Sequence, residues 1–226
     1  MGRSMPLIIA LGIGAIALAA SPFAHADPDM LQDFCVAVKD SEATVFVNGR
    51  ICKNITEVTA DDFYLQARFY IPQNTSNRLG YTPTPITVDK LPGLNTLGVA
   101  IGRVDLGPYG LSTPHTHPLG SEVFVVFEGT LYAGFIDSRN KLYAKTLRPG
   151  DIFVVPKGLI HFVYNTGGGN AVVFAAFGTQ NPDPVYIPEG LFGSDPPILP
   201  EVLSKAFLLD KDVINRLRSQ LHSELP

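Results

Sequence analysis

Two stretches of the chain decide its fold: HTHPLGSEVFVVFEG at residues 115–129 and GDIFVVPKGLIHFVYN at residues 150–165. Each holds a short run of Val, Ile, Phe and Tyr beside turn signals made of Gly and Pro, which is typical of β-strands. Similar runs recur along the chain, and they predict strands at Leu97–Val104, Glu122–Glu128, Thr130–Ile136, Leu142–Leu147, Ile152–Val155, His161–Tyr164 and Ala171–Phe177. The repetition indicates an all-β sandwich or barrel.

Several of these runs are apolar on both faces. Val123–Phe127 reads VFVVF, whereas a strand with one wet face would alternate apolar and polar side chains. One face of such a strand can fill a barrel, and the other needs a cover as well. We expect a second sheet or a partner subunit to supply that cover.

Helices are predicted only near the two ends of the barrel region. Asp61-Asp62 followed by Phe63–Phe69 predicts a short helix, and Pro200–Phe207 and Asp210–His222 predict two more, the last with Asp210 as its N-cap. The last helix carries one apolar stripe: Val213, Ile214, Leu217 and Leu221. This stripe fits either packing within the chain or an oligomer contact.

Composition restricts the class of protein. The chain has 226 residues, with 17 Lys and Arg against 21 Asp and Glu, a net charge of -4 and a charged fraction of 17%. This balance argues against a nucleic-acid partner and against a basic membrane-surface protein. The length suits one domain, whose core needs no metal or disulfide merely to collapse.

The first 26 residues have the features of a secretory signal peptide. Arg3 precedes an apolar run at Met5–Ala20, which is short for a membrane span, and Ala24-His25-Ala26 supplies a small-x-small cleavage pattern. No other stretch of the sequence is predicted to cross a membrane. We therefore expect residues 1–26 to be removed and the mature protein to be secreted.

Secretion changes how the cysteines and two asparagines are interpreted. Cys35 and Cys52 are the only cysteines, and an oxidising compartment favours a bond between them. Asn54 and Asn74 each begin an Asn-x-Ser/Thr sequence, which is the acceptor pattern for N-glycosylation. We predict one intramolecular disulfide and two candidate glycosylation sites.

The histidines carry the chemistry. His115 and His117 are two residues apart, so an extended backbone points both imidazoles to one face. Glu122 begins the next predicted strand, and His161 begins another. Together these residues offer three imidazoles and one carboxylate to a divalent metal ion.

The two quoted stretches resemble the paired motifs of cupins, and specifically of plant germins and germin-like proteins. H-x-H-x4-E-x6-G is matched by His115, His117, Glu122 and Gly129. G-x5-P-x-G-x2-H-x3-N is matched by Gly150, Pro156, Gly158, His161 and Asn165. The resemblance extends from LQDFC at residues 31–35 to LFGSDPP at residues 191–197, which is nearly the whole mature chain.

This resemblance implies a single cupin jelly-roll β-barrel at residues 61–197, preceded by an N-terminal arm at residues 27–60 and followed by C-terminal helices at residues 198–226. It implies one manganese ion per subunit, held by His115, His117, Glu122 and His161. It also implies a defence-related glycoprotein of the plant apoplast, associated with the cell wall, that forms a homohexamer as a trimer of dimers. Gly150, Pro156 and Gly158 would shape turns, and Asn165 would be a turn residue and not a ligand.

Three positions depart from the family pattern. Tyr109 stands where the family usually has glycine six residues before the first histidine, which predicts a different turn there. In the oxalate oxidases of the family two asparagines contact substrate, and the corresponding positions here are Gly102 and Ser112. Glycine brings no side-chain hydrogen bond, and a hydroxyl cannot copy both donors of an amide. Oxalate oxidation is therefore disfavoured.

Three functions from different classes fit this sequence. The first is redox catalysis at manganese, above all superoxide dismutation, which needs an open coordination position but no pocket for an organic substrate. The second is oxalate oxidation. The third is non-catalytic, as a cell-wall structural or defence protein or a binder of a small ligand such as a plant hormone, with the metal holding the barrel together.

Overall fold

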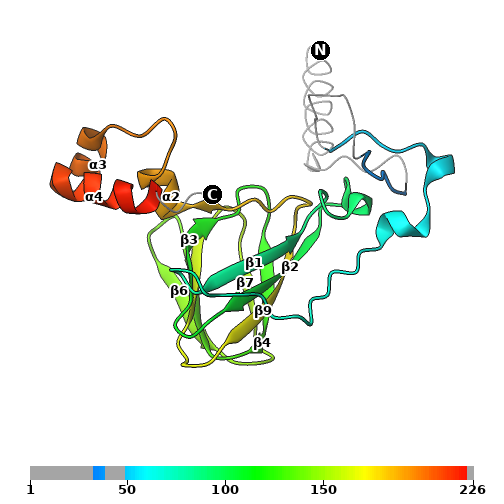
Figure 1. The fold of residues 1–226 in the computed structure, drawn as a ribbon, viewed down its shortest axis with the longest axis horizontal. Coiled ribbons are helices and arrows are strands. Elements are labelled where there is room, and N and C mark those ends of the chain that lie inside the picture. Colours follow the sequence, from blue (N-terminus) through cyan, green and yellow to red (C-terminus); the bar gives the residue numbers. More distant parts are fainter. Residues whose placement is uncertain (1–32, 39–48, 223–226) are drawn as a thin grey trace, which may run out of the picture. The chain divides into compact units, whose positions relative to one another are not determined.

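A computed structural model describes residues 33–38 and 49–222, so the predicted signal peptide lies outside the described residues. Two five-stranded antiparallel sheets face each other as a jelly-roll (Figure 1). The first sheet runs in the order β1 (Tyr81–Ile86), β2 (Ala100–Leu106), β9 (Ala171–Phe177), β4 (Glu122–Glu128) and β7 (Ile152–Val155). The second runs in the order β10 (Val185–Tyr186), β3 (Leu111–Thr116), β8 (Ile160–Asn165), β5 (Leu131–Ile136) and β6 (Leu142–Leu147).

The strands with strong apolar runs lie where the sequence predicts them. Strands β4, β6, β7 and β9 have the predicted bounds, and β5 and β8 differ by a residue at one or both ends. The prediction for Leu97–Val104 was wrong at its start, since β2 begins at Ala100 and continues to Leu106.

Three strands were not predicted: β1, β3 and the two-residue β10. The first two contain proline, which disfavours a strand prediction: β1 reads YTPTPI and β3 reads LSTPHT. Strand β1 is the edge of its sheet, where a residue without a backbone N–H is tolerated. In β3 the pairing with β8 shifts register between Ser112 and His115, around Pro114. The edge position of β1 and the register shift in β3 therefore accommodate prolines that disfavour a strand.

The core fills the space between the two sheets. Its buried members come from both: Leu106, Phe124, Val126, Leu131, Ala133, Leu147, Val155, Val163, Ala171, Val173 and Ala175. Burial of these side chains is the main stabilising term, at about 25 cal/mol for each Å² of apolar surface removed from water. This core fixes the two sheets face to face.

The outer face of β4 and β7 stays apolar and exposed within one chain. Phe124 and Val126 point into the core, whereas their neighbour Phe127 is 65% exposed, and Ile152 and Val154 on β7 are 66% and 57% exposed. The VFVVF run therefore has one face in the core and one face uncovered by the described residues of this chain. We expected a second sheet or a partner subunit to cover this run, and the second sheet covers only its inner face.

A short arm precedes the barrel, and the described parts of it are tied together covalently. The Cys35–Cys52 disulfide spans a sequence separation of 17 residues, as predicted. Ala37 pairs with Cys52 in an isolated antiparallel bridge. Ala37 also donates a backbone hydrogen bond to Pro92 across 3.1 Å, which joins this arm to the loop before β2.

The helix expected after Asp61-Asp62 is wrong over most of its length. Between Ile55 and Tyr64 the helical backbone is limited to the 3-10 turns η1 (Ile55–Glu57) and η2 (Ala60–Phe63), and Tyr64 is already extended. A third 3-10 turn, η3 (Pro92–Leu94), lies further along the chain. Tyr64 is 66% exposed, so a longer helix would have little apolar burial to offset its nucleation cost.

Three helices follow the barrel: α2 (Ile187–Phe192), α3 (Pro200–Phe207) and α4 (Lys211–His222). The bounds of α3 are as predicted, α4 begins one residue later than predicted, directly after Asp210, and α2 was not predicted. Ile214 of the predicted stripe is fully buried, and α4 packs against α2 and α3. The stripe therefore packs within the chain, against neighbouring helices.

The motif residues outside the histidine cluster shape turns, as predicted. Gly158 has φ +76°, a left-handed conformation that favours glycine. A Cβ on Gly129 would lie 2.4 Å from Ala171, so glycine permits this close approach. Asn165 is fully buried, and its amide nitrogen donates to Gly107 and Gly169 while its oxygen accepts from Gly167.

Replacing both Cys35 and Cys52 by Ser is expected to lower the free energy of unfolding by about 3 kcal/mol, because the closed loop restricts the unfolded chain. Urea unfolding of the purified protein measures the change. Two thiols that react freely with a thiol reagent in the folded native protein would contradict the disulfide.

Asn165→Ala is expected to lower the free energy of unfolding by about 1–3 kcal/mol, because it leaves the buried carbonyl of Gly107, and the carbonyl of Gly169, without their partner. The metal content should be retained, since Asn165 is not among the proposed ligands. A variant that keeps wild-type stability and loses metal would give Asn165 the opposite role.

Candidate metal centre

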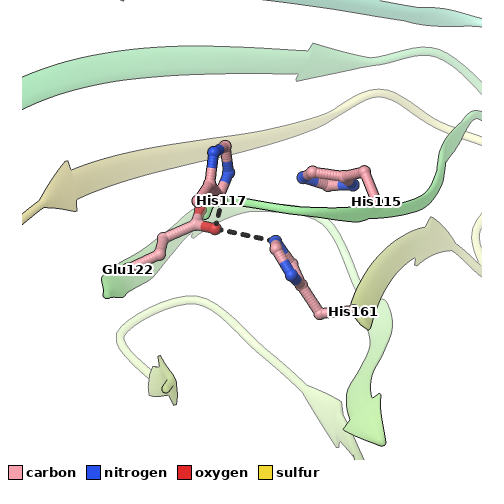
Figure 2. Close-up of side chains that lie close together, drawn as sticks. All are labelled: His115, His117, Glu122 and His161. Atoms are coloured by element: carbon pink, nitrogen blue, oxygen red, sulfur yellow. Dashed lines mark ion pairs between the residues drawn. The ribbon is translucent and has the colours of Figure 1, made fainter. Parts of the chain in front are cut away.

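The four predicted ligands come from three strands and one turn, and they meet between the sheets. His115 lies near the end of β3, opposite His161 on β8, and His117 follows in the turn after β3. Glu122 is the first residue of β4, in the facing sheet. Their ligand atoms lie within 4.8 Å of one another, and all four residues are buried (Figure 2).

Each imidazole has its Nδ1 atom beside a backbone carbonyl. His115 Nδ1 lies 2.8 Å from Thr113 O, His161 Nδ1 lies 3.0 Å from Leu159 O, and His117 Nδ1 contacts Pro182 O. A carbonyl can only accept, so these contacts place the ring proton on Nδ1. The Nε2 lone pairs are thereby left for a metal ion.

The Nε2 atoms converge on the carboxylate. His161 Nε2 lies 3.0 Å and His117 Nε2 lies 3.5 Å from the same Glu122 oxygen (Figure 2). This oxygen and His161 Nε2 are also buried without a satisfactory hydrogen bond. With the proton on Nδ1, an imidazole nitrogen and a carboxylate oxygen are both acceptors, so they approach favourably only around an added proton or a shared cation. The short approach of His161 Nε2 to Glu122 therefore fits a site that holds a metal ion.

The protonation states also suit metal binding. Burial lowers the pKa of His115 to about 4, and the neighbouring His161 contributes in the same direction. Burial raises the pKa of Glu122, but the close approach of the His117 and His161 rings outweighs it and lowers the pKa to about 2. At neutral pH His115 is neutral and Glu122 is ionised, which are the forms that coordinate metals.

A cavity of about 120 Å³ lies beside the four residues, between the sheets. It is lined by two residues that depart from the family pattern, Gly102 on β2 and Ser112 on β3. Tyr81 and Tyr186 line it too, and the sequence analysis did not identify them. The ring of Tyr186 lies 5.4 Å from that of His115, but nothing in the spacing of Tyr81 and Tyr186 signals that they meet.

The third departure, Tyr109, lies in the turn before β3. Tyr109 has φ +57°, the left-handed conformation that glycine adopts most easily. Its backbone N–H donates to Gly167 across 3.2 Å. This turn therefore holds a side chain in a conformation that favours glycine.

The glycosylation candidates lie on the surface. Asn54 and Asn74 are both exposed. Asn54 caps η1 by accepting from the Thr56 N–H across 3.1 Å, and Asn74 accepts from the Ser76 N–H across 2.9 Å. Neither lies among the residues that line the cavity.

Comparison with known proteins agrees with the fold. The cupin family matches residues 68–215. Germin-like protein subfamily 1 member 7 of Arabidopsis thaliana is 50% identical over 211 residues, covering 92% of this chain and 91% of the relative. The chain belongs to the germin-like proteins of the cupin family.

This germin-like chain is also similar to a protein of rice and to a solved structure. Germin-like protein 4-1 of Oryza sativa subsp. japonica is 49% identical over 199 residues, covering 86% of this chain and 78% of the relative. An oxalate oxidase in complex with the substrate analogue glycolate has a TM-score of 0.83 and 42% identity, and the match covers 88% of this chain and 100% of that one. The oxalate oxidase therefore shares the jelly-roll fold of this chain.

Metal binding to this germin-like site is expected to raise the unfolding temperature by about 5–10 °C when the ion is at about 100 times its dissociation constant. Differential scanning calorimetry of metal-free and manganese-loaded protein measures the shift. In Glu122→Gln the shift should vanish, because the only anionic ligand is gone.

His222→Ala is the matched control, since His222 is a histidine outside the set of four proposed ligands. It should keep the full manganese-dependent shift. An unchanged shift in Glu122→Gln would mean that manganese stabilises the protein from elsewhere.

Proposed function

We propose that this chain is a manganese protein that binds one ion per subunit through His115, His117, Glu122 and His161. The observation that carries the proposal is the set of three Nδ1–carbonyl contacts, which turn three Nε2 lone pairs toward one buried carboxylate. Three imidazoles and one carboxylate suit a borderline-hard divalent ion. The adjoining cavity leaves room for further ligands such as water.

The first proposed activity is superoxide dismutation, in which two superoxide ions and two protons give dioxygen and hydrogen peroxide. Bound manganese would supply the one-electron redox chemistry. The chain contributes three neutral imidazoles and one negative carboxylate, so a divalent ion leaves the site with a net charge of about +1 that attracts an anion. Superoxide is small enough to need no shaped organic pocket.

Oxalate oxidation is the second candidate, because the oxalate oxidase with bound glycolate is 42% identical to this chain. The residues beside the site argue against it. Gly102 and Ser112 line the cavity where that family uses two asparagines. Each hydrogen bond lost to a charged group commonly costs about 1.5–3 kcal/mol, which together amounts to several hundredfold or more in binding.

A non-catalytic role is the remaining alternative. In that case manganese would hold the ends of β3, β4 and β8 together and would contribute stability alone. The biological effect, as a structural or defence protein or as a binder of a small hormone-like ligand, would survive removal of the ion.

We also propose the surroundings in which this site works. The predicted signal peptide, the disulfide and the exposed Asn54 and Asn74 support secretion into the apoplast and glycosylation there. The exposed apolar face of β4 and β7 supports assembly into a homo-oligomer, with a hexamer as the expected number. No helix in the described part of the chain is both long and apolar enough to span a membrane.

Dismutase activity is expected to rise in proportion to manganese content and to fall at least about tenfold in His117→Ala, which removes one of the four proposed ligands. Inhibition of cytochrome c reduction by superoxide, measured beside metal analysis of the same samples, tests this. His222→Ala should retain full activity. Activity that persists after complete removal of manganese would refute the proposal.

Oxalate should release little hydrogen peroxide from the native protein. The double variant Gly102→Asn with Ser112→Asn is expected to raise that release, because both amides would face the cavity. A peroxidase-coupled assay measures it. High oxalate oxidase activity in the native protein would make oxalate oxidation the function and would show that the two asparagines are dispensable.

A further inference from the structure

The cavity beside the proposed metal site opens between the edges of the two sheets. Strand β1 is the edge of one sheet, and β10 is the edge of the other. Tyr81 at the start of β1 and Tyr186 at the end of β10 meet across this gap, with their hydroxyl oxygens 3.4 Å apart. Prolines on both sides line the same opening: Pro83, Pro85, Pro182 and Pro184.

The inner walls of the cavity are apolar. They are formed by side chains from both sheets: Val104, Phe124, Val163, Val173 and Phe177. The volume of about 120 Å³ is close to that of cavities of about 150 Å³ that take up benzene. Gly102 enlarges this space, because no side chain projects from the β2 position that faces Phe177. The dimensions therefore suit a single ring.

Three hydroxyls line the cavity beside the four proposed ligands. Ser112, Tyr81 and Tyr186 all line it, and the Ser112 hydroxyl interacts with that of Tyr81. A separation of 3.4 Å is long for an O–H···O hydrogen bond, and each hydroxyl has one donor and two acceptor positions. The cluster formed by Ser112, Tyr81 and Tyr186 therefore has unused hydrogen-bonding capacity.

This hydroxyl cluster is neutral at physiological pH. A tyrosine phenol has an ordinary pKa of about 10, so it is protonated at neutral pH. Both phenols therefore keep their protons and act as donors and acceptors without charge. Such groups recognise an alcohol oxygen and offer no full charge to a carboxylate.

No free cation among the described residues faces the cavity. Arg103 is the one lysine or arginine that lines it, and its guanidinium donates to Asp105 at 2.8 and 2.6 Å. That guanidinium also lies 5.8 Å from the ring of Phe174 on the outer side of the sheet. Asp183 adds a carboxylate to the lining. A dianion such as oxalate therefore meets repulsion at the rim and no cationic partner beyond a bound metal.

We propose that this cavity binds a small neutral single-ring alcohol such as a phenol, with its ring on the apolar walls and its hydroxyl bonded to Ser112, Tyr81 and Tyr186. The site goes beyond the manganese chemistry, because none of these three residues belongs to the proposed ligand set. The four proposed metal ligands line the same cavity, so an occupant would lie directly beside the ion. The three hydroxyls remain available to it with or without the metal.

Isothermal titration calorimetry with phenol, on the full-length purified protein, tests the proposal before and after removal of metal by a chelator. Phenol should bind both forms with a dissociation constant below about 1 mM, a modest affinity for seven heavy atoms. Benzoate and oxalate should bind the metal-free form at least about tenfold more weakly. Equal or tighter binding of either anion to metal-free protein would overturn the proposal.

Gly102→Val should weaken phenol binding at least about tenfold by filling the ring space. A Cβ at position 102 meets Phe177, Pro85 and Thr84 at 3.6 Å, an ordinary contact, so the backbone tolerates the change. Gly169→Ala is the matched control, because a Cβ there meets nothing within 4 Å, and it should bind phenol normally.

Tyr186→Phe and Ser112→Ala test the hydroxyl cluster and should each weaken phenol binding about three- to tenfold, because each removes one hydrogen-bonding group. They keep the cavity volume nearly unchanged, so they remain informative if Gly102→Val fails to fold. No phenol binding by the folded native protein, or wild-type binding in Gly102→Val and both hydroxyl variants, would refute the site. Manganese content should be normal in all of them, which separates this failure from a failure of the metal proposal.

Discussion

Three backbone carbonyls, those of Thr113, Leu159 and Pro182, determine what the site can do. Each takes the Nδ1 side of one imidazole, so each Nε2 faces the Glu122 carboxylate. Two of these carbonyls lie two residues before the histidine they contact, and the third comes from the segment between β9 and β10. The ligand geometry is therefore a property of the folded barrel, and every strand that places these carbonyls contributes to it.

The four site residues were predictable because short sequence motifs determine where they lie. His115 and His117 share a face through their spacing, and the turns at Gly150 and Gly158 bring His161 into register with His115 on the neighbouring strand. The apolar runs of β4 and β9 predict their bounds for the same reason, since their side chains meet the core along the whole strand. Here local pattern and tertiary packing agree.

Where local pattern and packing disagree, the sequence was a poor guide. The prolines of β1 argue against a strand, yet an edge position needs fewer backbone donors. The helix expected after Asp61 is limited to η2, and Tyr64 and Leu65 beyond it are exposed, so a longer helix would bury little of either. Tyr81 and Tyr186 meet although 105 residues separate them, and only the two sheet edges bring them together.

In this account the residues beside the proposed metal ligands select the reaction. One set of three imidazoles and one carboxylate can serve several chemistries, whereas Gly102, Ser112 and the two tyrosines line the cavity through which other molecules would approach it. In this chain those residues give an apolar cavity with a neutral hydroxyl cluster. This favours either a very small anion at the metal or an uncharged ring beside it over a dicarboxylate.

The most direct test of the central claim is X-ray diffraction from crystals of the purified protein on both sides of the manganese absorption edge. The account predicts one anomalous peak per subunit, bonded to Nε2 of His115, His117 and His161 and to the carboxylate of Glu122. A peak elsewhere, a different metal at this position, or no peak in protein purified without chelators would contradict it.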